Sequence, residues 1–139
     1  MGRRIERDSM LMSVAQIMAQ RGTCTRLHVG AVITRESRII SSGYVGAPKG
    51  ISHCDVDNCY SDKPCSRTVH AEANAVAFAA RTGVSTEGTV MYVTHSPCME
   101  CAKLIINAGV SKVIYFEAYR DDAPILYLRK AGVTCAQYK

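Results

Sequence analysis

Two short stretches of the chain carry residues whose types and spacing suit metal-assisted hydrolysis. His70 is followed two positions later by Glu72, and Pro97 is followed by the pair Cys98 and Cys101. One imidazole and two thiolates are zinc ligands, and three of them leave one position of a tetrahedral shell open for a water molecule. A zinc-activated water ionises near neutral pH, and Glu72 is placed to take its proton and pass it to a leaving group. A purely structural zinc site is the alternative, and it leaves Glu72 unexplained.

Length and composition limit the classes of protein that this sequence can encode. The chain has 139 residues, 47% of them hydrophobic and 21% charged, which predicts a single domain over 1–139. It shows no apolar run long enough to span a membrane and no apolar core of a signal peptide at its start. Seven cysteines, an odd number, then favour a reducing, cytoplasmic setting. The net charge of +5 suits an anionic substrate. Because the chain has no run of five Lys or Arg residues, this charge does not indicate a nucleic-acid partner.

Hydrophobic periodicity and turn residues predict four helices and five strands. The helices are expected over 6–21, 69–82, 97–108 and 122–130, and the strands over 29–34, 38–43, 89–94, 112–117 and 133–136. This order predicts an α/β protein, a three-layer α/β/α sandwich around a mixed five-stranded sheet. Both candidate ligand stretches then fall at the starts of helices, where the positive end of the helix dipole favours thiolates.

Further segments extend the pattern beyond the candidate zinc ligands. They read Val-Gly-Ala-Val-Ile from Val29, Ile-Ile-Ser-Ser-Gly-Tyr from Ile39, His-Ala-Glu-Ala-Asn-Ala from His70, Met-Tyr-Val-Thr from Met91 and Ser-Pro-Cys-Met-Glu-Cys-Ala-Lys from Ser96. In this order they resemble the deoxycytidylate (dCMP) deaminase family of the zinc-dependent cytidine deaminase superfamily. The resemblance covers nearly the whole chain.

The resemblance implies a cytidine-deaminase-like fold and hydrolysis of dCMP to dUMP and ammonia, which supplies dUMP for thymidylate synthesis. Glu72 would protonate N3 and then the departing amine, beside zinc on His70, Cys98 and Cys101. Family members form hexamers, and most are activated by dCTP and inhibited by dTTP. We therefore also expect a homohexamer, with Mg²⁺ accompanying a bound nucleoside triphosphate.

The substrate contacts are expected from four residues, Arg26, Val45, Ser96 and Tyr119. Arg26 lies in the turn before the first strand, where a guanidinium can clamp the 5′-phosphate. Tyr119 follows the fourth strand and is expected to pack on the base edge, with packing in the core as an equally weighted alternative. The family usually has Asn, which holds the sugar, where this chain has Val45. Because valine has neither donor nor acceptor there, a neighbouring group holds the sugar or its recognition is looser.

A loop of about twenty residues before the catalytic helix contains clustered thiols. Cys54, Cys59 and Cys65 lie in it, and Cys24 precedes the first strand. These four cysteines are expected to hold a second, structural zinc, with His53 as the alternative to Cys54 and buried unliganded thiols as the other interpretation.

The effector site is expected in the Gly- and Pro-rich loop from 43 to 50. Its backbone N–H groups can form an anion-binding nest, to which Lys49 adds a charge. The expected effector and interface residues are Tyr44, Gly46, Lys49, Gly50, Phe78 and Arg81. Phe78 and Arg81 share one helix face, which suits a subunit interface; the alternative puts Phe78 in the core.

Two other functional classes compete with dCMP deamination. One is a related deaminase that acts on free cytidine, a tRNA adenosine or single-stranded DNA. The chain has no Trp and only two Phe with which to stack bases, which disfavours a polynucleotide substrate. The other is a non-catalytic zinc protein that binds nucleotides or RNA, in which a fourth protein ligand would close the zinc site.

Overall fold

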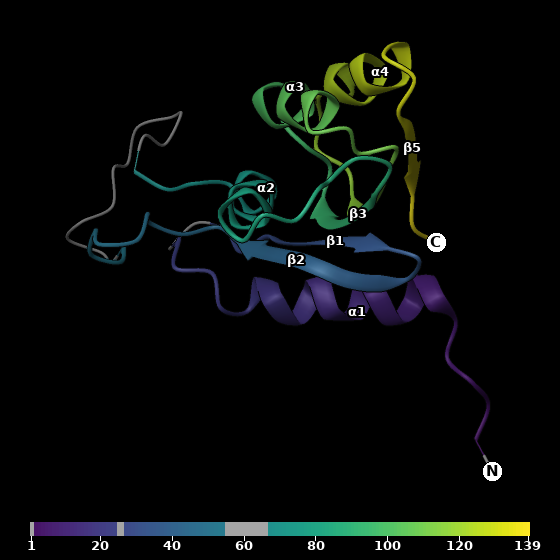
Figure 1. Cartoon of the computed structure of the whole chain (residues 1–139), viewed down its shortest axis with the longest axis horizontal. Coiled ribbons are helices and arrows are strands. Elements are labelled where there is room, and N and C mark those ends of the chain that lie inside the picture. The colour runs from purple at the N-terminus through teal and green to yellow at the C-terminus, as the bar shows by residue number, and fades with distance from the viewer. Residues whose placement is uncertain (1, 25–26, 55–66) are drawn as a thin grey trace.

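The computed structural model describes residues 2–24, 27–54 and 67–139. In the described part of the chain, four helices and five strands alternate in the predicted order (Figure 1). The elements are α1 (Arg7–Ala19), β1 (Gly30–Arg35), β2 (Arg38–Tyr44), α2 (Ala71–Arg81), β3 (Val90–His95), α3 (Met99–Asn107), β4 (Lys112–Glu117), α4 (Ala123–Lys130) and β5 (Thr134–Gln137). None of the helices among the described residues is long and apolar enough to cross a membrane.

The five strands form one mixed sheet, as predicted. Their order is β2-β1-β3-β4-β5, with β1 antiparallel to both β2 and β3 and the last three strands parallel to one another. The carboxyl ends of β3 and β4 therefore meet at one edge, where open α/β sheets commonly carry their sites. The register there pairs His95 with Glu117.

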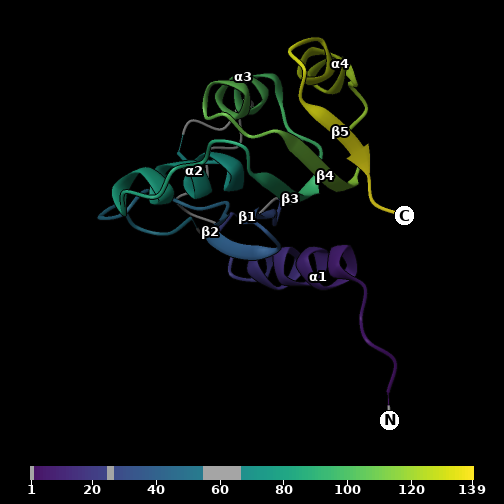
Figure 2. The same cartoon turned by 45° about the vertical axis from the view of Figure 1, so that its right-hand side comes forward.

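Helices cover both faces of the sheet, which confirms the three-layer sandwich. In Figures 1 and 2, α1 lies alone on one face, while α2, α3 and α4 lie on the other. The α1 face buries Leu11 and Met12 against Val32, Tyr92 and Ile114. The opposite face buries alanines of α2 and apolar residues of α3 and α4 against alternate residues of the same strands. The period-two alternation along each strand thus divides the core into two layers.

Helix α2 lies close to the sheet because β2 has a glycine, Gly43, beneath the first turn of that helix. A Cβ atom at Gly43 would overlap the Ala71 carbonyl oxygen and lie 2.7 Å from the Ala75 backbone nitrogen. Ser41, also on β2, donates a 2.6 Å hydrogen bond to the Ala75 carbonyl. These contacts fix the depth of α2 and hence the height of its N-terminus above the sheet.

Two helix starts differ from the sequence prediction, and the differences affect the candidate site. α2 begins at Ala71 with His70 as its N-cap, and α3 begins at Met99 with Cys98 as its N-cap. Both caps have extended backbones, with ψ of 153° at His70 and 173° at Cys98. The first expected ligand of each stretch therefore precedes the helix rather than lying within its first turn.

Candidate active site

The structure brings His70, Cys98 and Cys101 together at the N-termini of α2 and α3. The Nδ1 atom of His70 lies 3.4 Å from the Cys98 Sγ atom and 3.3 Å from the Cys101 Sγ atom. The three donor atoms all lie within 4.8 Å of one another. This group is the one cluster of three or more potential metal ligands in the described parts of the chain.

The donor set fits a zinc ion. In a tetrahedral site with Zn–S near 2.3 Å and Zn–N near 2.0 Å, a nitrogen and a sulfur ligand lie about 3.5 Å apart. The two observed N–S distances, 3.3 and 3.4 Å, agree with that value. Cys101 is buried while His70 is exposed, so the three donors line a site that opens to solvent on one side. Such a shell leaves a position for water or substrate.

The two candidate ligand thiols differ in acidity. Hydrogen bonds from the Cys101 thiol and from His70 lower the pKa of Cys98 to about 3. The same bond to Cys98, together with burial, raises the pKa of Cys101 far above its ordinary value. Cys98 is therefore the more acidic thiol of the pair, and both residues would hold a zinc ion as thiolates.

Glu72 is buried beside the three donors, in the first turn of α2. Only 4% of its surface is exposed. Burial raises the pKa of Glu72 to about 7 despite the opposing effect of nearby His70. A carboxyl group with a pKa near neutrality can both accept and return a proton during one reaction cycle. The proton-transfer role expected of Glu72 from the sequence stays a prediction.

Ser96 and Tyr119 lie where the segments after β3 and β4 meet. The Tyr119 backbone N–H donates to the Ser96 Oγ atom at 2.9 Å, and the Ser96 N–H donates to the Glu117 carbonyl at 2.8 Å. Tyr119 is 41% exposed, so its placement in the core is wrong. Burial of its hydroxyl raises the pKa of Tyr119 to about 12, with further contributions from Glu72, Cys98 and Cys101. Through its hydrogen bond to Ser96, the Tyr119 backbone is joined to the segment that leads to Cys98.

Of the other two expected substrate residues, Arg26 and Val45, the structure describes only Val45. Arg26 lies outside the described residues. Val45 is 7% exposed and belongs to the core, where its N–H donates to the Val29 carbonyl and its carbonyl accepts from Thr23 N–H. Through these two hydrogen bonds, Val45 joins the start of the loop after β2 to Thr23 and to Val29.

Five of the six expected effector and interface residues line one cavity of about 350 Å³: Tyr44, Gly46, Lys49, Gly50 and Phe78. Phe78 is 51% exposed, so the alternative that placed it in the core is wrong. Arg81, the sixth, is exposed near the end of α2 and does not line this cavity.

Asn74 also lines this cavity and was missed by the sequence analysis. Its side-chain amide donates to the Tyr44 carbonyl at 2.8 Å and, more weakly, to the Val69 carbonyl at 3.4 Å. The spacing of four from His70 to Asn74 could have indicated a shared helix face. The Gly46 and Val69 backbones form two further hydrogen bonds, of 2.8 and 3.2 Å.

The expected structural zinc site falls partly outside the described residues. Cys59 and Cys65 lie in the segment 55–66, which the structure does not describe. Of the other two expected ligands, Cys24 is buried and Cys54 is partly exposed, each as a free thiol. His53, the alternative to Cys54, lines the 350 Å³ cavity.

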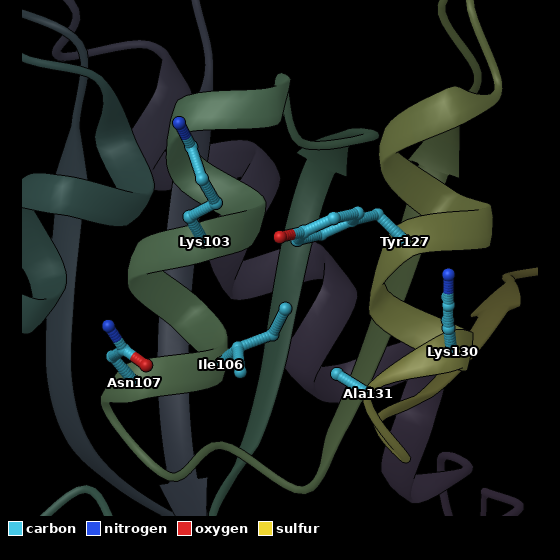
Figure 3. A pocket seen from close by; sticks show the side chains of 6 residues that line it. All are labelled: Lys103, Ile106, Asn107, Tyr127, Lys130 and Ala131. Atoms are coloured by element: carbon cyan, nitrogen blue, oxygen red, sulfur yellow. The ribbon is translucent and has the colours of Figure 1, made fainter.

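A separate cleft of about 440 Å³ lies between α3 and α4 (Figure 3). Its lining residues are Lys103, Ile106, Asn107, Tyr127, Lys130 and Ala131. The Tyr127 hydroxyl points across the cleft toward α3. None of the residues expected to act in catalysis or binding lines this cleft.

Comparisons with known proteins agree with the geometry. Residues 5–117 match the family model of the cytidine and deoxycytidylate deaminase zinc-binding region. The chain is 43% identical over 136 residues to ComE operon protein 2 of Bacillus subtilis strain 168, an alignment covering 96% of this chain and 72% of that protein. It is 34% identical to the deoxycytidylate deaminase of Enterobacteria phage T2, over 90% of this chain and 88% of that protein.

A solved structure shares the fold over almost its full length. The dCMP deaminase from cyanophage S-TIM5, in complex with dCMP and dUMP, has a TM-score of 0.86 and 33% sequence identity. The match covers 99% of this chain and 100% of that chain. Taken with the His/Cys/Cys centre and the buried Glu72, these matches show that the chain is a hydrolytic enzyme belonging to the cytidine and deoxycytidylate deaminase family.

Proposed function

We propose that this enzyme hydrolyses dCMP to dUMP and ammonia, and so supplies dUMP for thymidylate synthesis. The observation that carries the proposal is the buried carboxyl group of Glu72 beside three zinc donors that leave a position open. The choice of dCMP among cytosine substrates is supported by the phage T2 relative and by the cyanophage complex, whose names specify that nucleotide.

In the proposed reaction, Glu72 moves both protons of the attacking water. Zinc held by His70, Cys98 and Cys101 would polarise that water and favour its ionisation near neutral pH. Glu72 first takes one proton as the oxygen adds to C4 of the pyrimidine, and delivers it to N3. It then carries the second proton from the new hydroxyl to the amino group as the C4–N bond breaks. Ammonia leaves, and the product keeps a carbonyl at C4 and a hydrogen on N3.

Substrate positioning is assigned to residues around this centre. The exposed Tyr119 ring, whose backbone is bonded to Ser96 in the segment before Cys98, is proposed to contact the edge of the pyrimidine. Ser96, only 1% exposed, is proposed to act by holding the backbone of Tyr119. The Arg26 guanidinium is proposed to bind the 5′-phosphate, as a bidentate partner. Val45 is proposed to shape the sugar-side loop from the core, because its side chain offers no hydrogen bond.

Regulation by dCTP and dTTP is proposed at the 350 Å³ cavity, in a homohexamer. The cavity combines a backbone rich in glycine, the Lys49 ammonium group and the exposed Phe78 ring, which suit a triphosphate and a base. Mg²⁺ would accompany the triphosphate. Phe78 and Arg81 are proposed to lie at the subunit interface.

A second, structural zinc is proposed on Cys24, Cys54, Cys59 and Cys65. Four thiolates form a closed tetrahedral shell, which stabilises a fold without leaving a position for chemistry. Its proposed effect is to order the loop that follows the cavity residues. His53 remains the alternative to Cys54.

The decisive assay is ammonia release by the zinc-loaded protein from dCMP, CMP, deoxycytidine and oligo-dC. We expect the highest kcat/KM with dCMP, and a response of that rate to dCTP and dTTP. A kcat/KM as high with oligo-dC or deoxycytidine would contradict the assigned substrate. A strict preference for dCMP without any response to either triphosphate would contradict only the regulation.

A further inference from the structure

The carboxyl ends of β3 and β4 carry a contact between a histidine and a carboxylate that the proposed mechanism does not use. His95 ends β3, Glu117 ends β4, and the sheet register places the two opposite each other. The His95 Nε2 atom lies 3.2 Å from the Glu117 Oε2 atom. The imidazole is largely buried, with 18% of the side chain exposed, while 62% of the Glu117 side chain is exposed. The Glu117 carboxylate therefore contacts the Nε2 end of the His95 ring from the solvent side.

The other ring nitrogen of His95, Nδ1, faces the Thr94 hydroxyl. The Gly30 backbone N–H donates to the Thr94 Oγ1 atom at 3.2 Å, and this oxygen lies 3.4 Å from the His95 Nδ1 atom. Because the Glu117 carboxylate can only accept, Nε2 of His95 carries a hydrogen, and Nδ1 lies within reach of the Thr94 hydroxyl. A continuous chain of hydrogen bonds runs from the β1 backbone to the Glu117 carboxylate.

The ring fixed in this way is stacked on Tyr119. The two ring centroids are 5.4 Å apart with an interplanar angle of 29°. The Tyr119 backbone is held separately, by its 2.9 Å hydrogen bond to Ser96 Oγ. His95 therefore controls the face of the tyrosine ring, and Ser96 controls its backbone.

We propose that Glu117 is a positioning residue that acts through His95 to hold the Tyr119 ring next to the segment that leads to Cys98. The structural part of this inference is independent of the substrate, whereas its effect on dCMP rests on the function proposed above. Glu117 touches neither the zinc donors nor Glu72 in the contacts described, so its effect belongs to ground-state positioning. Because the pair is partly exposed, its loss should weaken substrate binding by only about 2–5-fold.

The absence of tryptophan from the chain provides a direct test in the zinc-loaded protein without substrate. Tyr119→Trp creates a single fluorescent probe at the stacked position. Adding Glu117→Ala to that background should lower the anisotropy of the probe and increase its quenching by acrylamide. Glu117→Gln should behave like the parent, since its amide oxygen still accepts from His95 Nε2–H. Glu36→Ala, in the β1–β2 turn at the opposite end of the sheet, is the matched control and should change neither signal.

Kinetics on dCMP then test the consequence in the native background, without the probe. Glu117→Ala should raise KM about 2–5-fold with kcat nearly unchanged, and this effect should disappear when Tyr119→Ala is also present. Unchanged anisotropy and quenching would overturn the proposal, as would a KM effect that persists fully with Tyr119→Ala. Altered fluorescence of the probe variants, together with no deamination of dCMP by the protein that keeps Tyr119, would instead sustain the positioning role and contradict the proposed substrate.

Discussion

Replacing Glu72 by Gln tests the proposed chemistry most directly. The change keeps the size of the side chain and removes its capacity to carry a proton. Loss of one positioned acid–base group typically slows a reaction by about 10²–10⁴-fold. Glu72 is assigned several transfers, and its 4% exposure leaves little room for water to replace it. We therefore expect kcat to fall at least about 10³-fold, which corresponds to about 4 kcal/mol of transition-state stabilisation.

The zinc content should remain that of the wild type, because the three clustered donors belong to other residues. The assay is ammonia release from dCMP by protein whose bound zinc has been measured. Glu100→Gln is a suitable control, since Glu100 is exposed and pairs only with Lys103 in the contacts described. Activity within about tenfold of the wild type would refute the role of Glu72. A loss of zinc that matches the loss of activity would show that Glu72 acts on the metal site instead.

Four other changes give distinct expected outcomes. Cys59→Ser should reduce bound zinc from about two ions per chain to about one and lower stability; a wild-type content of one ion would contradict the structural site. Arg26→Ala should raise KM for dCMP but hardly for deoxycytidine, and equal effects on both would show that Arg26 does not bind the phosphate. Arg81→Glu should give smaller assemblies by light scattering and abolish the dCTP response with the zinc content intact. Asp8→Asn should cost about 1 kcal/mol of unfolding free energy at pH 7, because it loses the charge that accepts the 2.6 Å hydrogen bond from Tyr92. That bond lowers the pKa of Asp8, so the stabilisation exists above the unfolded pKa and is lost as the pH falls through the folded one. The difference between the two proteins in urea unfolding should therefore shrink toward pH 3, and a constant difference would contradict this assignment.

The sequence predicted the layers because each element has a clear local signal. Alternating or continuous apolar runs mark the strands, and β4 has the predicted bounds, Lys112–Glu117. The helix starts were less accurate, since Pro97 was expected to lie within the helix but precedes the N-cap Cys98. Side-chain type does not reveal that a cap residue keeps an extended backbone, and this backbone is what directs the Cys98 side chain into the site.

Contacts between elements were not accessible from local patterns. The contact of His95 with Glu117 could not be predicted, because it depends on the β3–β4 register. A shift of one residue would move Glu117 to the other face of the sheet. Asn74 was missed for a similar reason, since its partner, the Tyr44 carbonyl, is thirty residues away in the sequence.

The connection between the proposed effector cavity and the zinc ligands follows from these long-range contacts. Gly46 in the cavity loop forms two backbone hydrogen bonds with Val69, the residue before the ligand His70. Asn74 joins the same loop to the helix that carries Glu72. An occupant of the cavity can change activity only by the difference in its affinity for two arrangements of these groups. Because the His70 cap is one residue from the bridge, a displacement of Gly46 would reach the metal site through the backbone. The Gly46–Val69 hydrogen bonds therefore connect the proposed effector cavity directly to the residue before His70. The proposed regulation needs no longer path through the core.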